Sequence, residues 1–221
     1  VLYDQENESR HVPLRHFSKE QGLFEIVDSF LSEFGVLGFE YGYSQTDPKT
    51  LVIWEAQFGD FSNGAQTIID QFITTGERKW LRMSGLTLLL PHGHEGQGPE
   101  HTSSRLERFL QMCAEDNIQV ANCTSPANYF HILRRQQLRE FRKPLILMTP
   151  KSTLRHKNNT SSIDDFINGS TFHRVLDKTH SKQQQDKISR VVLCSGKIYF
   201  ELQDYIDKFK KENIHIVRIE Q

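Results

Sequence analysis

The chain has 221 residues, of which 37% are hydrophobic and 25% are charged, and its formal net charge is −1. This composition is ordinary for a globular protein, and the balanced charge provides no global field that would attract nucleic acid or an anionic membrane. No apolar run approaches the roughly 20 residues that span a bilayer. The sequence therefore predicts neither a nucleic-acid partner nor a membrane-spanning helix.

The three cysteines, Cys113, Cys123 and Cys194, lie far apart and form no CxxC pair. An odd number at such spacing argues against a disulfide framework and against a thiolate zinc site. A reducing compartment fits this cysteine usage best. The N-terminal residues include no initiator methionine and no secretory signal, so we interpret the chain as a fragment.

The first predicted helix covers residues 23–30, where apolar residues recur at spacings of three and four. Glu33 follows it, ahead of an apolar segment that contains Gly35, Gly38 and Gly42. Glycines at this spacing on a helix allow close packing against another backbone, so we expect Glu33 near a helix N-terminus at an interface. There it either exchanges a proton or only interacts favourably with the helix dipole.

The next predicted elements are a strand at 51–54 and an amphipathic helix at 65–72. Between them Phe58 and Phe61 stand three residues apart. Two such rings could clamp a flat ligand, whereas core packing is the commoner role of a lone phenylalanine pair. The sequence leaves both interpretations open.

The loop from His92 to His101 holds three histidines, two glutamates and three glycines, and it follows an apolar run at 86–90 that predicts a buried strand. Ligands of α/β proteins bind at the carboxyl ends of such strands. We therefore favour a catalytic or substrate-binding loop in which imidazoles meet an anionic intermediate. The alternatives are a solvated turn and a metal site. The ligands of that metal site would be His92, His94, Glu95 and His101.

A helix at 106–113 follows this loop, with Ser104 and Glu107 spaced as a capping box. A strand is predicted at 118–121, and Ser125 followed by Pro126 predicts the start of another helix. Basic residues gather around that helix and its exit, where they could meet a phosphate or an acidic partner, although a solvated face is the simpler explanation. They are Arg134, Arg135, Arg139, Arg142 and Lys143.

Apolar runs at 145–148, 191–194 and 214–217 predict three further strands, and a helix is predicted at 202–209. Short apolar runs that alternate with amphipathic helices predict βαβ units, hence an α/β fold with a mostly parallel sheet. Residues 151–187 are rich in Ser, Asn, Gln and Lys and have few periodic apolar positions. We interpret this stretch as a polar connection to a second, incomplete unit.

Long motifs at five places carry a family resemblance. They are 36–44, 53–61 with 63–66, 89–103, 143–156, and 194–197 with 217–221. In these segments the chain resembles the thiamine diphosphate-dependent decarboxylase component of the 2-oxoglutarate dehydrogenase complex. The resemblance covers nearly the whole chain and is weakest between about residues 158 and 187.

This resemblance implies a transketolase-like fold. Residues 1–156 would form a pyrimidine-binding domain, residues 157–187 a polar linker, and residues 188–221 the beginning of a C-terminal α/β domain. The cofactor, thiamine diphosphate, would lie between this domain and a diphosphate-binding domain of the partner subunit.

The resemblance also assigns roles to individual residues. It implies that Glu33 hydrogen-bonds N1′ of the cofactor's aminopyrimidine, and that Phe61, with Phe58 behind it, packs on the pyrimidine ring. His92 would face the reacting carbon, and His101 would support its loop. The family's Gly-Asp-Gly motif for magnesium and diphosphate is missing, because Phe61 follows Gly59-Asp60. Magnesium would therefore be held by a part of the parent protein outside this chain.

The parent implied by the resemblance decarboxylates 2-oxoglutarate in the tricarboxylic acid cycle. It passes the succinyl group to the lipoyl arm of a dihydrolipoyl succinyltransferase. We expect a homodimer, in the bacterial cytoplasm or the mitochondrial matrix, and an inactive fragment. The alternatives are a related 2-oxoadipate-type decarboxylase, a metal-dependent hydrolase built on the His92–His101 loop, and a noncatalytic assembly module that binds through the Arg134–Arg142 face.

Overall fold

The computed structural model describes residues 1–167, 169–178 and 181–221. The chain divides into two compact units, residues 1–30 and residues 31–221. The first unit contains an antiparallel pair, β1 (Leu2–Tyr3) and β2 (Arg10–His11), and the short 3-10 helix η1 (Pro13–Arg15).

The helix predicted at 23–30 is wrong, because the structure has no regular element there. Its apolar side chains are exposed, and Phe30 is fully so. A helix of two turns is marginal in water unless its apolar face is buried by tertiary packing, and the first unit offers no such surface.

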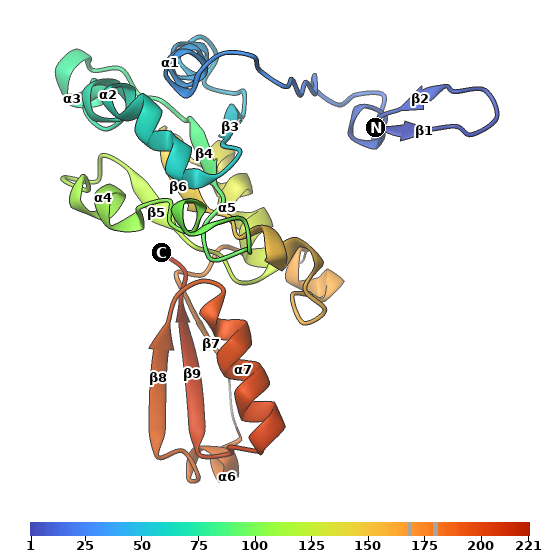
Figure 1. The fold of residues 1–221 in the computed structure, drawn as a ribbon, viewed down its shortest axis with the longest axis vertical. Coiled ribbons are helices and arrows are strands. Elements are labelled where there is room, and N and C mark those ends of the chain that lie inside the picture. The colour runs from blue at the N-terminus through green and yellow to red at the C-terminus, as the bar shows by residue number, and fades with distance from the viewer. Residues whose placement is uncertain (168, 179–180) are drawn as a thin grey trace. The chain divides into compact units, whose positions relative to one another are not determined.

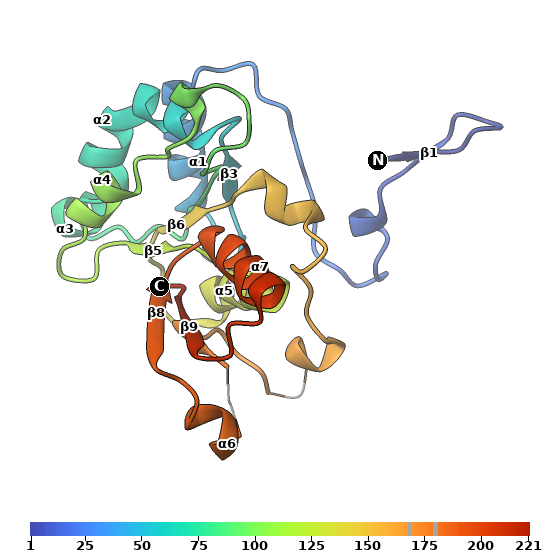
Figure 2. The same cartoon turned by 60° about the horizontal axis from the view of Figure 1, so that its bottom comes forward.

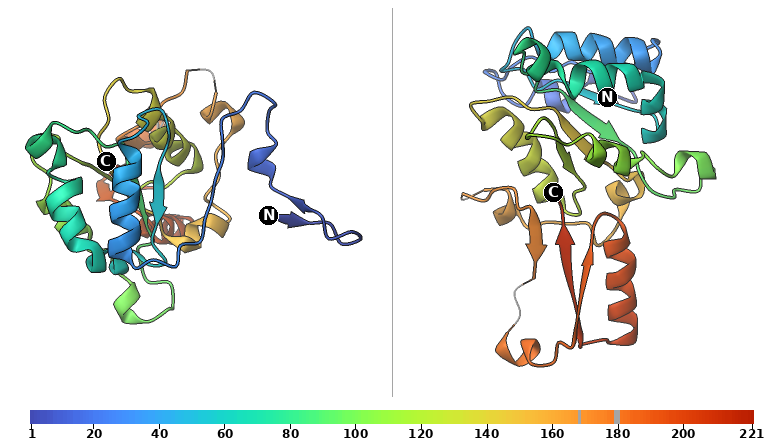
Figure 3. Two further views of the ribbon diagram at one scale, coloured as in Figure 1. Left: turned by 90° about the horizontal axis from the view of Figure 1, so that it is seen from above. Right: turned by 90° about the vertical axis from the view of Figure 1, so that its left-hand side faces the viewer.

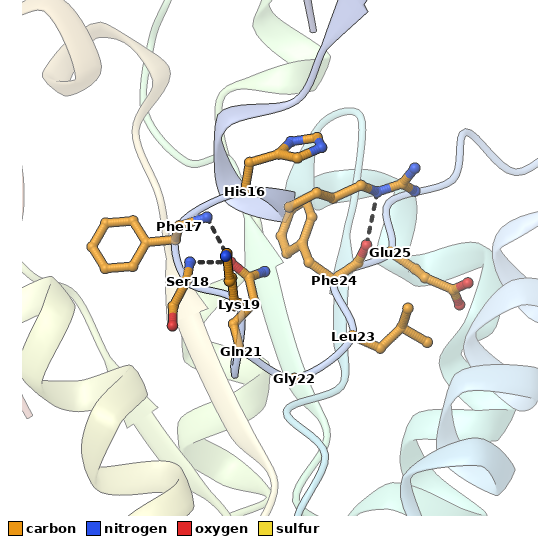
Figure 4. Close-up of a pocket in the computed structure, with 10 residues that line it drawn as sticks. His16, Phe17, Ser18, Lys19, Gln21, Gly22, Leu23, Phe24 and Glu25 are labelled. Atoms are coloured by element: carbon orange, nitrogen blue, oxygen red, sulfur yellow. Dashed lines mark hydrogen bonds between the residues drawn. The ribbon is translucent and has the colours of Figure 1, made fainter.

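A hollow in the first unit is lined by residues 15–19 and 21–25 (Figure 4). Its shape is held by local hydrogen bonds: Gln21 Oε1 accepts from the backbone N–H groups of Phe17 and Ser18, and Arg15 Nε donates to the Phe24 carbonyl. None of the residues predicted to have a functional role lines this hollow.

The second unit is built on a four-stranded sheet in which every neighbouring pair is parallel. This confirms the strands predicted from apolar runs and the parallel arrangement predicted from their alternation with helices. The two inner strands are buried along their whole length, as parallel strands covered on both faces must be. In spatial order the strands are β3 (Ile53–Glu55), β4 (Thr87–Leu90), β6 (Leu145–Met148) and β5 (Gln119–Ala121).

Helices cover both faces of this sheet (Figures 1 and 2). Leu88 and Ile146 face a core shared with α1, α2 and α4, whereas Leu147 faces a core shared with α5. Among the described residues no helix is long and apolar enough to cross a membrane. The helical elements are α1 (Glu33–Ser44), η2 (Gly59–Ala65), α2 (Gln66–Ile68), the π-helical turn η3 (Ile69–Ile73), α3 (Gly76–Trp80), η4 (Pro99–His101), α4 (Leu106–Gln111) and α5 (Pro126–Leu138).

Two predicted helix starts have different outcomes. Ser125 caps α5, since its hydroxyl accepts from the Asn128 backbone N–H, and this start is confirmed. The capping box of Ser104 with Glu107 is wrong: α4 is preceded by Arg105 in the left-handed conformation. The Ser104 hydroxyl donates instead to the Pro91 carbonyl at 2.8 Å, so a tertiary hydrogen bond replaces the local cap.

A second sheet follows, in the order β7 (Val175–Asp177), β9 (Ile214–Ile219) and β8 (Arg190–Cys194). Strands β8 and β9 are parallel and joined by α7 (Ile198–Phe209), as predicted, whereas β7 is antiparallel to β9. The three residues of β7 lie in the stretch that we interpreted as a polar connection. This stretch also holds η5 (Lys151–Arg155), η6 (Ile163–Asp165) and α6 (Lys182–Gln185).

The two sheets meet where the carboxyl end of β9, followed by Glu220, reaches the carboxyl end of β5 (Figure 1). Glu220 is 1% exposed, and its carboxylate accepts from the Thr124 backbone N–H and from Asn128 Nδ2, each at 2.9 Å. Its backbone carbonyl accepts from the Asn122 N–H at 2.8 Å. A buried carboxylate is tolerated only with such donors, so Glu220 fixes the second sheet against the end of β5.

Leu88, fully buried on β4, tests the core. We expect Leu88→Ala to lower the free energy of unfolding by roughly 2–5 kcal/mol, because it removes apolar contacts and leaves a cavity. Urea denaturation measures the change. The matched control Leu154→Ala, at a side chain 83% exposed, should change it by less than about 0.5 kcal/mol. Equal effects of the two substitutions would contradict this description of the core.

Candidate functional site

Glu33 is the first residue of α1, as expected from its position before the apolar glycine-containing segment. Ser32 caps the helix by accepting from the Gly35 backbone N–H. Glu33 is half-buried against η2, and its Oε2 lies 3.6 Å from the point where a Cβ on Gly64 would stand. Within the part of the chain that the structure describes, this carboxylate has no hydrogen-bond or ion-pair partner, so it is available to a ligand.

Phe58 and Phe61 meet the imidazole of His101, which comes from the predicted loop. The His101 ring stacks on Phe58 with centroids 4.6 Å apart and planes 17° apart, and it lies 5.1 Å from Phe61. The two phenylalanine rings are 6.4 Å apart. The flat ring that this pair contacts in the structure is therefore that of His101, and Phe61 remains partly exposed.

Asp60 is a site residue that the sequence analysis missed. It is buried, and its carboxylate lies 3.2 Å from Nδ1 of His101. Arg105 Nη1 donates to the Asp60 carbonyl at 3.3 Å. The only signal in the sequence was a lone aspartate between two phenylalanines at a strand end. Its carboxylate orients His101, as an acidic partner commonly orients a functional imidazole.

His92 follows β4, and its hydrogen-bond partner lies outside the cluster of Phe58, Phe61 and His101. Its Nδ1 accepts from the Ser104 backbone N–H at 3.0 Å, so the proton of the neutral ring is on Nε2. Burial lowers the pKa of His92 below its ordinary value of 6.5, and Lys197 lowers it further, whereas Glu107 opposes the shift. His92 is therefore a neutral imidazole at neutral pH, with Nε2–H as its remaining donor.

The rest of the loop is held in place by a backbone hydrogen bond and by side chains from later in the sequence. The Gly93 N–H donates to the Thr102 carbonyl at 2.7 Å. Glu95 accepts from Lys197 Nζ at 3.3 Å and from the Ser152 hydroxyl at 3.0 Å, while His94 is exposed. Because Glu95 and His101 have these separate partners, the four residues proposed as metal ligands do not converge. Across the described residues, no three His, Cys, Asp or Glu side chains are grouped to hold a metal ion.

Most of the basic residues around α5 form hydrogen bonds or ion pairs with other residues of the chain. Arg135 and Arg139 both donate to Gln119 Oε1, and Lys143 forms an ion pair with Glu77 at 2.6 Å. Arg134 is exposed. These internal partners weaken the interpretation of the Arg134–Arg142 face as a docking surface.

Comparisons with known proteins agree with this fold. Residues 7–157 match the family described as transketolase, pyrimidine binding domain, and residues 160–221 match the 2-oxoglutarate dehydrogenase C-terminal family. Over 229 aligned positions the chain is 60% identical to proteins named 2-oxoglutarate dehydrogenase E1 component from Brucella abortus (strain S19), Brucella anthropi and Brucella ovis. The match covers 100% of this chain but 23% of each relative, so the chain spans about a quarter of their length.

The lowered pKa of His92 gives a test of this site. The folded chain holds fewer protons on His92 than the unfolded chain, so its contribution to stability decreases as the pH falls through 6.5. NMR titration of the ring should place the folded value below that of the same residue in urea. The variant His92→Asn should lose this part of the pH dependence of unfolding. A folded value at or above the unfolded one would show that the ring is not buried as described.

Proposed function

The chain belongs to the family of transketolase pyrimidine-binding domains, and we propose that it forms the aminopyrimidine-binding half of the active site of a 2-oxoglutarate dehydrogenase E1 component. The observation that carries this proposal is the Glu33 carboxylate. It lies at the N-terminus of α1, beside the turn that bears Phe61, and has no partner among the described residues.

The residues present fit the pyrimidine half of thiamine diphosphate. A carboxylate accepts a hydrogen bond from a protonated ring nitrogen, and an adjacent aromatic side chain packs on the ring face. Glu33 and Phe61 supply these two groups. Gly64 lies beside Glu33, and a Cβ there would make an ordinary contact with the carboxylate oxygen at 3.6 Å.

When bound, the cofactor supplies the electron sink that decarboxylation of a 2-oxoacid requires. Glu33 would exchange a proton with N1′, and Phe61 would orient the ring. His92, locked by Ser104 with its proton on Nε2, would donate to the oxygen of the reacting 2-oxoacid. His101, held by Asp60, would position Phe58 and Phe61.

The remaining parts of the reaction belong to the longer parent protein. We infer that the parent holds magnesium and the diphosphate elsewhere and acts on 2-oxoglutarate. It would transfer the succinyl group to the lipoyl arm of a dihydrolipoyl succinyltransferase, and in a bacterium it would work in the cytoplasm. The names and sequence identities of the relatives support this assignment over a 2-oxoadipate-type enzyme.

We also propose that α1 contributes to a homodimer interface. Together with α2 it covers one face of the larger sheet (Figure 3). Its apolar side chains Phe34, Phe39 and Tyr43 are between 44% and 60% exposed. No atom lies within 4 Å of a Cβ built on Gly42, so a second backbone has room to approach. Burial of this apolar strip would place Glu33 at the edge of the interface.

The role of Glu33 can be tested in the full-length protein that carries this chain. With thiamine diphosphate and magnesium, we expect turnover of 2-oxoglutarate in preference to 2-oxoadipate and pyruvate. Glu33→Ala should lower kcat by at least roughly a hundredfold, because it removes a proton-transfer group. The control Glu115→Ala, at a side chain 79% exposed, should leave kcat unchanged. Unchanged turnover in Glu33→Ala would favour a noncatalytic assembly role for this chain.

The interface can be tested by analytical ultracentrifugation of the same protein. Phe39→Asp places a charge on the exposed strip of α1 and should weaken dimerisation by roughly 2 kcal/mol or more. Leu154→Asp, at a still more exposed position on η5, serves as the control. A dimer that is equally stable in both variants would exclude α1 from the interface.

A further inference from the structure

Lys197 links the second sheet to the histidine loop. It stands between β8 and α7, directly after Gly196, which has a φ of +73°. A Cβ on Gly196 would lie 2.3 Å from the Asn122 side chain. Glycine is therefore needed here on two grounds, its conformation and its contact with Asn122, and together they fix where the Lys197 side chain begins.

The Lys197 ammonium group binds the loop at two points. Nζ donates to the His94 backbone carbonyl at 2.7 Å and to Glu95 Oε1 at 3.3 Å. The side chains of Lys197 and Glu95 are 25% and 14% exposed, so this ion pair is partly shielded from solvent. Ser152 also donates to Glu95, which joins η5 to the same group.

The stem of Lys197 runs against the loop backbone. A Cβ on Gly93 would lie 2.8 Å from Lys197 Cδ, and Gly93 has a φ of +112°. The loop backbone therefore approaches the lysine stem at a position where a larger residue would collide with it. Gly93 is the neighbour of His92, so this contact acts directly beside the imidazole.

We propose that Lys197 is a positioning residue, which docks the His92–His101 loop onto the second sheet (β7, β9 and β8) and thereby fixes the orientation of His92. This inference rests on the proposed function, in which His92 faces the reacting atoms. The second sheet then becomes part of the active site, although no residue of this sheet is assigned a contact with the cofactor.

Charge gives Lys197 a second effect on His92. Two charged groups act on the imidazole from elements packed around it, Glu107 on α4 and Lys197 at the start of α7. The ammonium group lowers the pKa of His92 and the carboxylate raises it. Glu95, on the loop itself, is paired with Lys197. Loss of the lysine charge should therefore raise the pKa of His92.

The test uses the full-length protein with Lys197→Met, Lys197→Arg and the control Lys187→Met, which removes an exposed ion pair with Glu212 outside the strands of the second sheet. We expect Lys197→Met to lower kcat/KM at neutral pH by about tenfold or more, through misplacement of the loop. The acid limb of its pH profile should move to higher pH. Lys197→Arg should keep most of the wild-type kcat/KM and most of the wild-type pH profile. Lys187→Met should change neither.

Hydrogen exchange of the loop amides provides a readout that does not need activity. Lys197→Met should accelerate exchange at residues 93–98, and Glu95→Gln, which leaves the bond to the His94 carbonyl in place, should do so more weakly. Unchanged exchange together with an unchanged pH profile would overturn the proposal. If the wild-type protein turned over no 2-oxoacid, the proposed function would fail, while hydrogen exchange would still decide whether Lys197 holds the loop.

Discussion

The parallel arrangement of the strands is the constraint on which the rest of this structure depends. Because β3, β4, β5 and β6 all run in the same direction, the segments that follow them lie along one edge of the sheet. The ends of β8 and β9 meet that same edge through Lys197 and Glu220. Residues as distant in sequence as His94 and Lys197, 103 positions apart, therefore become neighbours.

Along this edge several buried polar groups have defined partners. Asp60 holds His101, the Ser104 backbone N–H fixes the ring of His92, and Thr124 together with Asn128 satisfies Glu220. Buried polar groups with partners are rigid, because any other arrangement leaves a donor or acceptor unpaired. The Glu33 carboxylate differs, since it is half-buried and without a partner among the described residues. The proposed active-site role of Glu33 rests on this difference between paired groups and an available acid.

The sequence predicted the elements whose cause is local. Continuous apolar runs identified the strands of the larger sheet, and Ser125-Pro126 marked the start of α5. The prediction of a helix at 23–30 failed because the spacing of apolar residues shows which of them share a helix face. It does not show whether any surface covers that face. The Ser104 cap failed because the Pro91 carbonyl, distant in sequence, binds the same hydroxyl. Asp60 and Lys197 escaped notice for a similar reason: their partners lie 41 and 103 positions away.

We propose that this edge of the sheet is the pyrimidine-binding half of a thiamine diphosphate site. A structure of the full-length protein with thiamine diphosphate and magnesium tests it most directly. We expect the Glu33 carboxylate within hydrogen-bond distance of N1′, Phe61 against the pyrimidine ring, and the His92 loop held by Lys197. A cofactor bound away from Glu33, with that carboxylate in contact only with solvent or protein, would contradict it.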